Sequence, residues 1–258
     1  IRLENLVDHW DHICQIAGNT FHVAIGSDLD GIFGTEQSPW DMDSIAEAID
    51  GNTKIIWICS PNNPTGNSIF YPDMEILLNN FDGLVVVDEA YINFAKQRSL
   101  VIDLKEYPNL VVMQTLSKAW GLAALRLGMI IASPEIVTWL NKIKPPYNIN
   151  QATQELALKA LNEVGQVNEM IRQIVQMRGT LTTALQQLPV VIKVYPSDAN
   201  FLLVKVKNAV KAYEHLLGDG IVVRDRSKVT LCDDCLRITI GTEEENEKLV
   251  EGLRNITV

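Results

Sequence analysis

The sequence predicts an α/β fold in which a mostly parallel sheet is followed by a smaller α+β region. Apolar runs of strand length alternate with helical stretches through the first half, a pattern typical of a parallel sheet buried on both faces. After Pro145-Pro146 the pattern changes to a long helical region and then to short strands interleaved with helices. The 258 residues leave room for one large or two modest domains, each with its own core.

Periodicity and turn residues predict the elements of the first half in order. Apolar residues at helical spacing indicate an amphipathic helix over 3–17, and a short strand over 21–26 and a helix over 44–49 follow. The next apolar runs are continuous, so we expect strands buried on both faces. These strands are expected at 54–59, 84–87, 110–113 and 127–132, and the helices beside them at 73–80 and 134–143.

The second half has a different rhythm. A long helical region is expected over 151–188, with a bend near Gly165. Strands are then expected at 191–194, 201–206, 221–224 and 236–240, and helices at 208–217 and 242–254. We interpret this part as a second, smaller α+β domain.

Composition and charge exclude several classes of function. Acidic residues number 32 against 22 basic ones, and no concentrated Lys/Arg footprint of the kind that binds nucleic-acid phosphates is found. The sequence has no run of about 18 apolar residues, so no membrane span is predicted. Its first residues do not resemble a secretion signal. The four cysteines are too few and scattered for a disulfide framework. We therefore expect a cytoplasmic protein that binds neither nucleic acid nor membrane.

Three predicted strands end in unusual polar residues. They lead into Asn62–Gly66, Asp88–Tyr91 and Thr115–Lys118. Each segment alone could be an ordinary turn, a helix cap or a solvated lysine. Open α/β sheets, however, bind ligands just past the carboxyl ends of their strands, so the three segments are expected at one site.

Together these segments supply what pyridoxal phosphate chemistry requires. Lys118 is the candidate for the Schiff base with the cofactor aldehyde, and Asp88 for the carboxylate that keeps the pyridine nitrogen protonated. Tyr91 and Asn63 are candidates for hydrogen bonds to the ring oxygen. Candidates for the cofactor phosphate are Ser117 and Arg126.

Six segments in order also resemble histidinol-phosphate aminotransferases, which are fold-type I, aspartate-aminotransferase-like enzymes dependent on pyridoxal phosphate. They are SPNNPTGN at 60–67, VDEAY at 87–91, QTLSKAWGLAALRLG at 114–128, KPPYNIN at 144–150, VVRDRS at 222–227 and CLRITIGT at 235–242. The resemblance covers about residues 45–258. It implies the same roles for Lys118, Asp88, Tyr91, Asn63, Ser117 and Arg126. It further implies a large domain over 45–165, with a mostly parallel sheet, and a small α+β domain over 166–258.

The resemblance also implies the substrates and the oligomeric state. Arg237 is expected to bind the α-carboxylate of glutamate, and Arg224 the phosphate of the substrate. The implied reaction moves an amino group between L-histidinol phosphate and 2-oxoglutarate in histidine biosynthesis, in a homodimer. Two alternatives stay open: an aromatic amino acid aminotransferase, and a truncated fusion that is catalytically incompetent.

The first residues depart from this pattern. Enzymes of the family carry a longer stretch before the SPNNPTG motif, so the large domain is expected to be incomplete. Residues 1–44 instead resemble a fragment of the membrane or renal dipeptidases, which are zinc enzymes, with Asp28 matching an active-site aspartate. The zinc ligands of that family have no counterparts here, and Cys232-x-x-Cys235 lacks a second ligand pair. We therefore expect no metal site.

Overall fold

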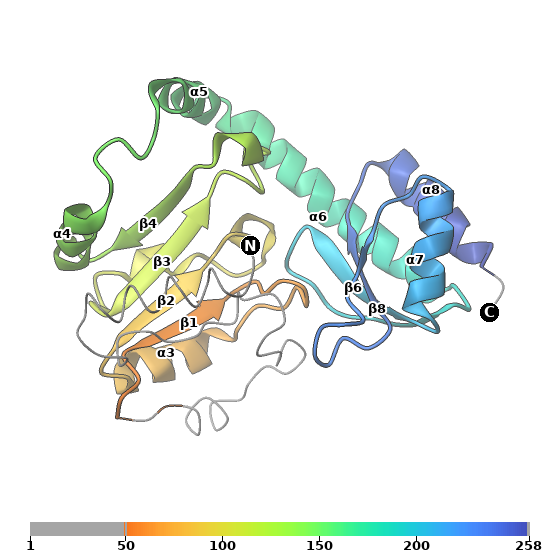
Figure 1. Cartoon of the computed structure of the whole chain (residues 1–258), viewed down its shortest axis with the longest axis horizontal. Helices are drawn as coiled ribbons and strands as arrows, with labels where there is room; N and C mark the ends of the chain where they lie inside the picture. The colour runs from red at the N-terminus through yellow and green to blue at the C-terminus, as the bar shows by residue number, and fades with distance from the viewer. Residues whose placement is uncertain (1–48, 50, 257–258) are drawn as a thin grey trace.

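The computed structural model describes residues 49 and 51–256 and contains two four-stranded sheets joined by a long helix (Figure 1). The segments predicted at 3–17, 21–26 and most of 44–49 lie outside the described residues. The strands and helices predicted downstream are all present, with ends that differ by a few residues.

The N-terminal sheet has the strand order β1-β2-β3-β4. Its strands are β1 (Ile55–Cys59), β2 (Leu84–Asp88), β3 (Leu110–Thr115) and β4 (Gly128–Ala132). The first three run parallel, and β4 is antiparallel to β3. Helix α3 (Tyr71–Asn80) packs Met74, Leu77 and Leu78 against the apolar side chains of β2 and β3, so one face of this sheet forms a core.

Burial differs along this sheet from what the sequence predicts. Strand β2 is buried on both faces at Val85, Val86 and Val87, as a continuous apolar run suggests. The same prediction is wrong for β4, where Met129 and Ile130 are exposed, and in part for β1, where Trp57 is 37% exposed. Both are end strands of the described sheet, so each has a neighbouring strand on one side only.

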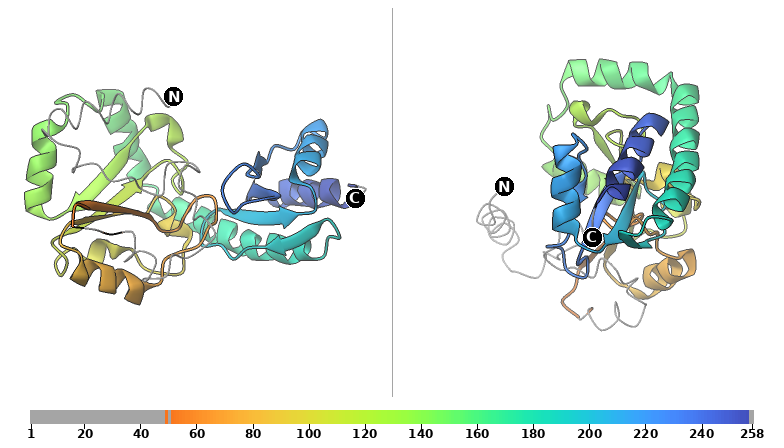
Figure 2. Two further views of the ribbon diagram at one scale, coloured as in Figure 1. Left: turned by 60° about the horizontal axis from the view of Figure 1, so that its bottom comes forward. Right: turned by 90° about the vertical axis from the view of Figure 1, so that its right-hand side faces the viewer.

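Three short helices lie in the connections of the N-terminal sheet, and three α-helices follow it before the C-terminal sheet begins. Short 3-10 helices η1 (Ile92–Phe94) and η2 (Leu100–Asp103) follow β2, and η3 (Ala123–Leu125) lies between β3 and β4. Helix α4 (Pro134–Ile143) follows the sheet. The predicted long helical region is two helices, α5 (Gln151–Leu161) and α6 (Val164–Gln186), which separate just before Gly165. Figure 2 shows α6 reaching from the N-terminal sheet to the C-terminal one.

The C-terminal sheet is antiparallel throughout, with the strand order β5-β6-β8-β7. Its strands are β5 (Val191–Val194), β6 (Phe201–Val206), β7 (Arg224–Asp225) and β8 (Cys235–Thr239). Helices α7 (Ala209–Gly218) and α8 (Glu243–Arg254) join α6 in covering one face, where Leu185, Leu216 and Leu253 are fully buried. The strand predicted over 221–224 pairs only at 224–225, because the Ile221 N–H is taken by the carbonyl of Leu216 at the end of α7.

A buried arginine on α6 ties the two sheets together. Arg178 is 6% exposed, and its Nη1 donates to the Phe94 carbonyl at 3.2 Å and to the Ala199 carbonyl at 2.6 Å. Burial lowers the pKa of its guanidinium, and the charge of Asp198 opposes that shift. The carbonyls belong to η1 and to the turn before β6, so one side chain fixes both regions to α6.

A glycine allows the second contact between the sheets. The Asp198 N–H donates to the Gly66 carbonyl at 2.6 Å, and Gly66 has a φ of +79°. A Cβ on Gly66 would lie 2.3 Å from the Ser197 Oγ, so a side chain at this position would force the two loops apart.

None of the described helices is long and apolar enough to cross a membrane.

We predict that Arg178→Met lowers the free energy of unfolding by about 2–4 kcal/mol, because two buried carbonyls lose a charged donor. Urea unfolding of the chain measures the change. The control is Arg172→Met on the same helix, where the guanidinium is exposed and forms an ion pair with Glu169 three residues before it. Equal losses in the two variants would show that the buried contacts of Arg178 are not what matters.

Candidate active site

Three loops leave the N-terminal sheet at the same edge. The register aligns Cys59 with Asp88 and Asp88 with Met113, so β1, β2 and β3 end side by side. Backbone bonds extend this alignment, since Ser60 N donates to Asp88 O at 3.0 Å and Glu89 N to Met113 O at 2.8 Å. The loops that carry the predicted site residues therefore begin together at the carboxyl ends of parallel strands.

The first loop presents Asn63 to the C-terminal sheet. Asn62 closes the turn by donating from Nδ2 to Thr65 Oγ1 at 2.8 Å and by accepting at its carbonyl from Gly66 N. Asn63 Oδ1 accepts a hydrogen bond of 2.6 Å from Arg237 Nη1 on β8. The structure thus brings together two predicted site residues that are 174 positions apart. With Oδ1 engaged by a guanidinium, the amide Nδ2 is the atom of Asn63 that can donate to a ligand.

Two aromatic rings in contact, Tyr91 and Phe201, lie between Lys118 and Arg237. Lys118 Nζ lies 5.2 Å from the centre of the Tyr91 ring, and that ring meets Phe201 edge-on with 5.2 Å between centroids. Arg237 Cζ lies 5.1 Å from the centre of the Phe201 ring. Both rings are buried, whereas Lys118 is exposed. The lysine and the arginine therefore sit on opposite ends of one rigid aromatic pair.

Asp88 and Glu89 point to different surroundings, as successive residues at a strand end do. Asp88 is half-buried, and its Oδ1 accepts from Ala90 N at 2.9 Å. Glu89 is 2% exposed and accepts three hydrogen bonds, from Ser99 Oγ at 2.5 Å, Leu100 N at 2.7 Å and Gln114 Nε2 at 2.9 Å. Asp88 is thus the acid available to a ligand, and Glu89 fastens the loop to its neighbours.

Ser117 and Arg126 flank the connection between β3 and β4. Thr115 Oγ1 donates to Ser117 Oγ at 2.9 Å and accepts from Ser117 N at 3.0 Å. The backbone of Leu127 returns to Leu116, with an N–H···O distance of 3.2 Å, so Arg126 lies next to this turn in the chain. The Arg126 side chain is exposed, and its Nη1 donates to Ala123 O at 3.1 Å. The structure does not show a contact between Arg126 and the other predicted residues among those described.

Arg224 lies opposite Arg237 in the C-terminal sheet. The two residues are register partners on β7 and β8, and the Arg224 side chain is exposed. Directly opposite residues of an antiparallel pair present their side chains on the same face. Arg224 therefore faces the same side as Arg237, toward the loop of Asn63.

Sequence reasoning missed Glu89, Arg178 and Phe201. Glu89 stands inside the VDEAY segment, and its signal is the alternation at the end of β2, which sends Asp88 and Glu89 in opposite directions. Phe201 opens a strongly apolar strand and looks like any core residue. Nothing local distinguishes Arg178 from the exposed polar residues of α6.

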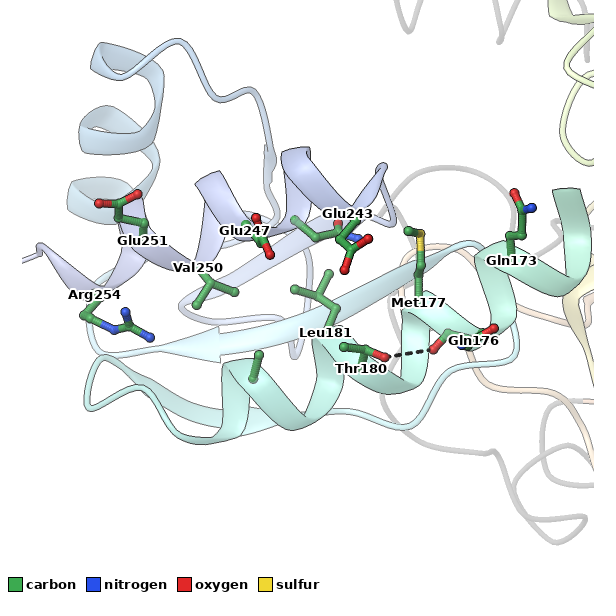
Figure 3. A pocket seen from close by; sticks show the side chains of 12 residues that line it. Gln173, Gln176, Met177, Thr180, Leu181, Glu243, Glu247, Val250, Glu251 and Arg254 are labelled. Carbon is green, nitrogen blue, oxygen red and sulfur yellow. Dashed lines mark hydrogen bonds between the residues drawn. The ribbon is translucent and has the colours of Figure 1, made fainter.

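A separate groove lies between α6 and α8, with a volume of about 650 Å³. Figure 3 shows Met177 and Leu181 on α6 facing Val250 and Glu247 on α8. Its lining residues are Gln173, Gln176, Met177, Thr180, Leu181, Ala184, Glu243, Asn246, Glu247, Val250, Glu251 and Arg254. It includes none of the predicted site residues. In the part of the chain that the structure describes, no three His, Cys, Asp or Glu side chains gather as metal ligands.

Comparison with known proteins identifies related chains. The family model described as aminotransferase class I and II matches residues 35–253. A histidinol-phosphate aminotransferase of Cytophaga hutchinsonii is 53% identical over 214 residues, which are 83% of this chain and 62% of that protein. The chain thus spans about three fifths of the length of this curated relative.

Two solved structures have the same fold. The histidinol-phosphate aminotransferase of Clostridium acetobutylicum matches with a TM-score of 0.78 and 26% identity, over 83% of this chain and 66% of that one. The histidinol-phosphate aminotransferase from Sinorhizobium meliloti, solved in complex with pyridoxal-5'-phosphate, matches with a TM-score of 0.71 and 25% identity. The match covers 83% of this chain and 60% of that one. The fold predicted from the sequence, a fold-type I α/β architecture with a mostly parallel sheet, is confirmed. The dipeptidase resemblance of residues 1–44 is not borne out, since the family match already begins at residue 35.

We predict that Glu89→Leu lowers the free energy of unfolding by about 2–4 kcal/mol, because three donors lose their acceptor in a buried position. Glu89→Gln should lower the free energy of unfolding by less, since its Oε1 can still accept from Leu100 N. The control is Glu106→Gln at an exposed position. Urea unfolding compares the variants, and a Leu variant as stable as the parent chain would contradict the role given to these hydrogen bonds.

Proposed function

The chain belongs to the aminotransferase class I and II family, and from this premise we propose that it transfers an amino group between L-histidinol phosphate and 2-oxoglutarate with pyridoxal 5'-phosphate as cofactor. The observation that carries the proposal is the convergence of Lys118, Tyr91, Asn63 and Arg237 at one edge of the N-terminal sheet. The relative from Cytophaga hutchinsonii, which bears the name of this activity, supports the choice of substrates.

The donor set fits the cofactor. An exposed primary amine on Lys118 and a hydroxyl on Ser117 follow β3, and a carboxylate on Asp88 ends the neighbouring strand β2 at the same edge of the sheet. When bound, pyridoxal phosphate supplies an aldehyde and an electron-withdrawing ring that stabilises negative charge on the substrate α-carbon. Lys118 is the residue for the aldehyde, and Asp88 the residue for the pyridine nitrogen. Ser117 and Arg126 are the residues that would bind the cofactor phosphate.

The remaining residues orient the ligands. Asn63 Nδ2 and the Tyr91 hydroxyl are donors for the ring oxygen of the cofactor. Arg237 offers the planar fork that suits a carboxylate, and its bond to Asn63 fixes one side of that fork. Lys118 is also our candidate for the proton carrier at the α-carbon, since an exposed primary amine beside the Tyr91 ring can exchange a proton with a bound substrate. Arg224 is the cation for the substrate phosphate.

Exposed apolar side chains support association into a homodimer. They are Trp139, Ile143, Tyr147 and Leu158, which are 60%, 79%, 93% and 66% exposed on or beside α4 and α5. Several large exposed apolar side chains this close together in the chain suit a protein interface. Our proposal places the dimer contact here, assigns residues 45–165 and 166–258 to two domains, and places the protein in the cytoplasm, where cysteines stay thiols.

The proposed function predicts turnover of histidinol phosphate and 2-oxoglutarate by the chain supplied with pyridoxal phosphate, and at least about 10³-fold slower turnover by Lys118→Ala, because the amine both holds the cofactor and moves the proton. Coupled detection of glutamate measures the rate. Borohydride reduction followed by peptide mass analysis should place the cofactor on Lys118.

Lys96→Ala is the control, since Lys96 is an exposed lysine in the loop after η1. It should keep both the rate and the label. Faster turnover with phenylalanine than with histidinol phosphate would instead favour an aromatic amino acid aminotransferase. A chain that neither binds the cofactor nor turns over would be the catalytically incompetent one.

The proposed dimer predicts that Ile143→Glu raises the dimer dissociation constant by about tenfold or more, because a charge is placed in an apolar contact. Sedimentation velocity over a concentration series measures it. Ile192→Glu is the matched control, since Ile192 is an exposed isoleucine on β5 of the other sheet. A parent chain that stays monomeric, or an equal effect of Ile192→Glu, would argue against this surface.

A further inference from the structure

The face of the C-terminal sheet that carries Arg237 holds two more arginines. Strand β7 pairs Arg224 with Arg237 and Asp225 with Leu236, and Arg226 N continues the ladder by donating to Cys235 O at 2.8 Å. Because side chains alternate along a strand, Arg224 and Arg226 lie on the face of Arg237. The alternate residue Leu236 belongs to the core on the other face.

The geometry of the strands sets how far apart these arginines lie. Register partners have Cα atoms about 4.5–5.5 Å apart, and residues two positions apart on one strand are about 7 Å apart. Arg224 and Arg226 can therefore reach one small anion from the same side. Arg237 is held toward the Asn63 loop, since its Nη1 donates to Asn63 and its guanidinium lies by the Phe201 ring, and it keeps the proposed role for the carboxylate.

Among the described residues, no carboxylate compensates the charges of Arg224 and Arg226. No ion pair to either residue is formed within the described ranges. The Nε atom of Arg226 is buried and has no hydrogen-bond partner there. The intervening carboxylate, Asp225, accepts from Ser227 N at 2.8 Å and from Ser227 Oγ at 2.6 Å.

Two like charges two residues apart, one with a buried unpaired N–H, are unfavourable unless an anion joins them. A dianionic phosphate monoester offers three oxygens and enough charge for two guanidinium groups. A single carboxylate is matched by one arginine, and Arg237 fills that role. The chemistry of this face therefore distinguishes a phosphorylated substrate from an unphosphorylated one.

We propose that Arg226 is a second phosphate-binding residue beside Arg224 and that it sets the preference for a phosphorylated amine. The inference rests on the proposed function and deepens it. Arg226 acts on the binding of the phosphate group, at a distance from the amine where the proton moves. Its loss should therefore change affinity for the phosphorylated substrate and leave the step at Lys118 intact.

Binding of histidinol phosphate and of histidinol to the purified chain tests this by isothermal titration, without need of turnover. The parent chain should prefer histidinol phosphate, and Arg226→Gln should raise its dissociation constant about 10- to 100-fold while leaving that for histidinol unchanged. Arg226→Lys keeps the charge but not the planar guanidinium. Its dissociation constant for histidinol phosphate should lie between those of the parent chain and of Arg226→Gln. Lys228→Gln, at an exposed position in the next turn, is the control and should match the parent chain.

Kinetics separates the failure of this inference from that of the proposed function. If the chain turns over, Arg226→Gln should raise the KM for histidinol phosphate and leave kcat and the KM for glutamate within about twofold, as loss of uniform binding does. Tighter binding of histidinol phosphate than of histidinol, without turnover, would support the phosphate-binding role of Arg226 and overturn the proposal that the chain is an enzyme. Equal losses for histidinol and histidinol phosphate, no preference in the parent chain, or an equal effect of Lys228→Gln would overturn the role of Arg226.

Discussion

The site depends on how two sheets with separate cores are held against each other, and the buried guanidinium of Arg178 is the main tie. It donates to carbonyls on both sides, at Phe94 after β2 and at Ala199 before β6. A charged donor removed from water is favourable only with such acceptors, so this position tolerates one arrangement of the two segments. The close approach of Gly66 and Ser197 adds a steric limit at a second point. Fixed at both points, the Asn63 loop meets Arg237 at hydrogen-bond distance.

Packing and site chemistry share the same side chains. Tyr91 and Phe201 belong to the buried cluster between the sheets, yet Lys118 rests on the first ring and Arg237 on the second. An edge-on aromatic pair in a close-packed cluster has little freedom to shift. The spacing between the amine and the guanidinium is therefore set by core packing, and a substrate that spans them meets a preorganised distance.

Local patterns predicted most of the fold and indicated the candidate site residues, because both leave marks in neighbouring positions. Apolar runs located β1 to β3, and turn residues at their ends located Asn63, Asp88 and Lys118. Long-range contacts leave no such mark. Arg178 reads as one more polar residue of a helix, since its acceptor Phe94 stands 84 positions away. The exposure of β4 likewise follows from its place in the sheet order, which its apolar run does not reveal.

The charge of the chain bears on how the proposed phosphate site would hold its ligand. The chain carries a net charge of −10, so its overall field repels an anionic substrate. At physiological salt that field decays over about 8 Å, and cations within contact distance decide whether a phosphate stays. In the proposal, Arg224 on β7 and the following Arg226, which form no ion pair with any described residue, provide such cations without a general basic surface. Binding on these terms comes from short, charge-assisted hydrogen bonds, which act on the lifetime of the complex more than on its rate of formation. If Arg226 binds the phosphate as proposed, loss of its guanidinium speeds the release of a phosphorylated ligand.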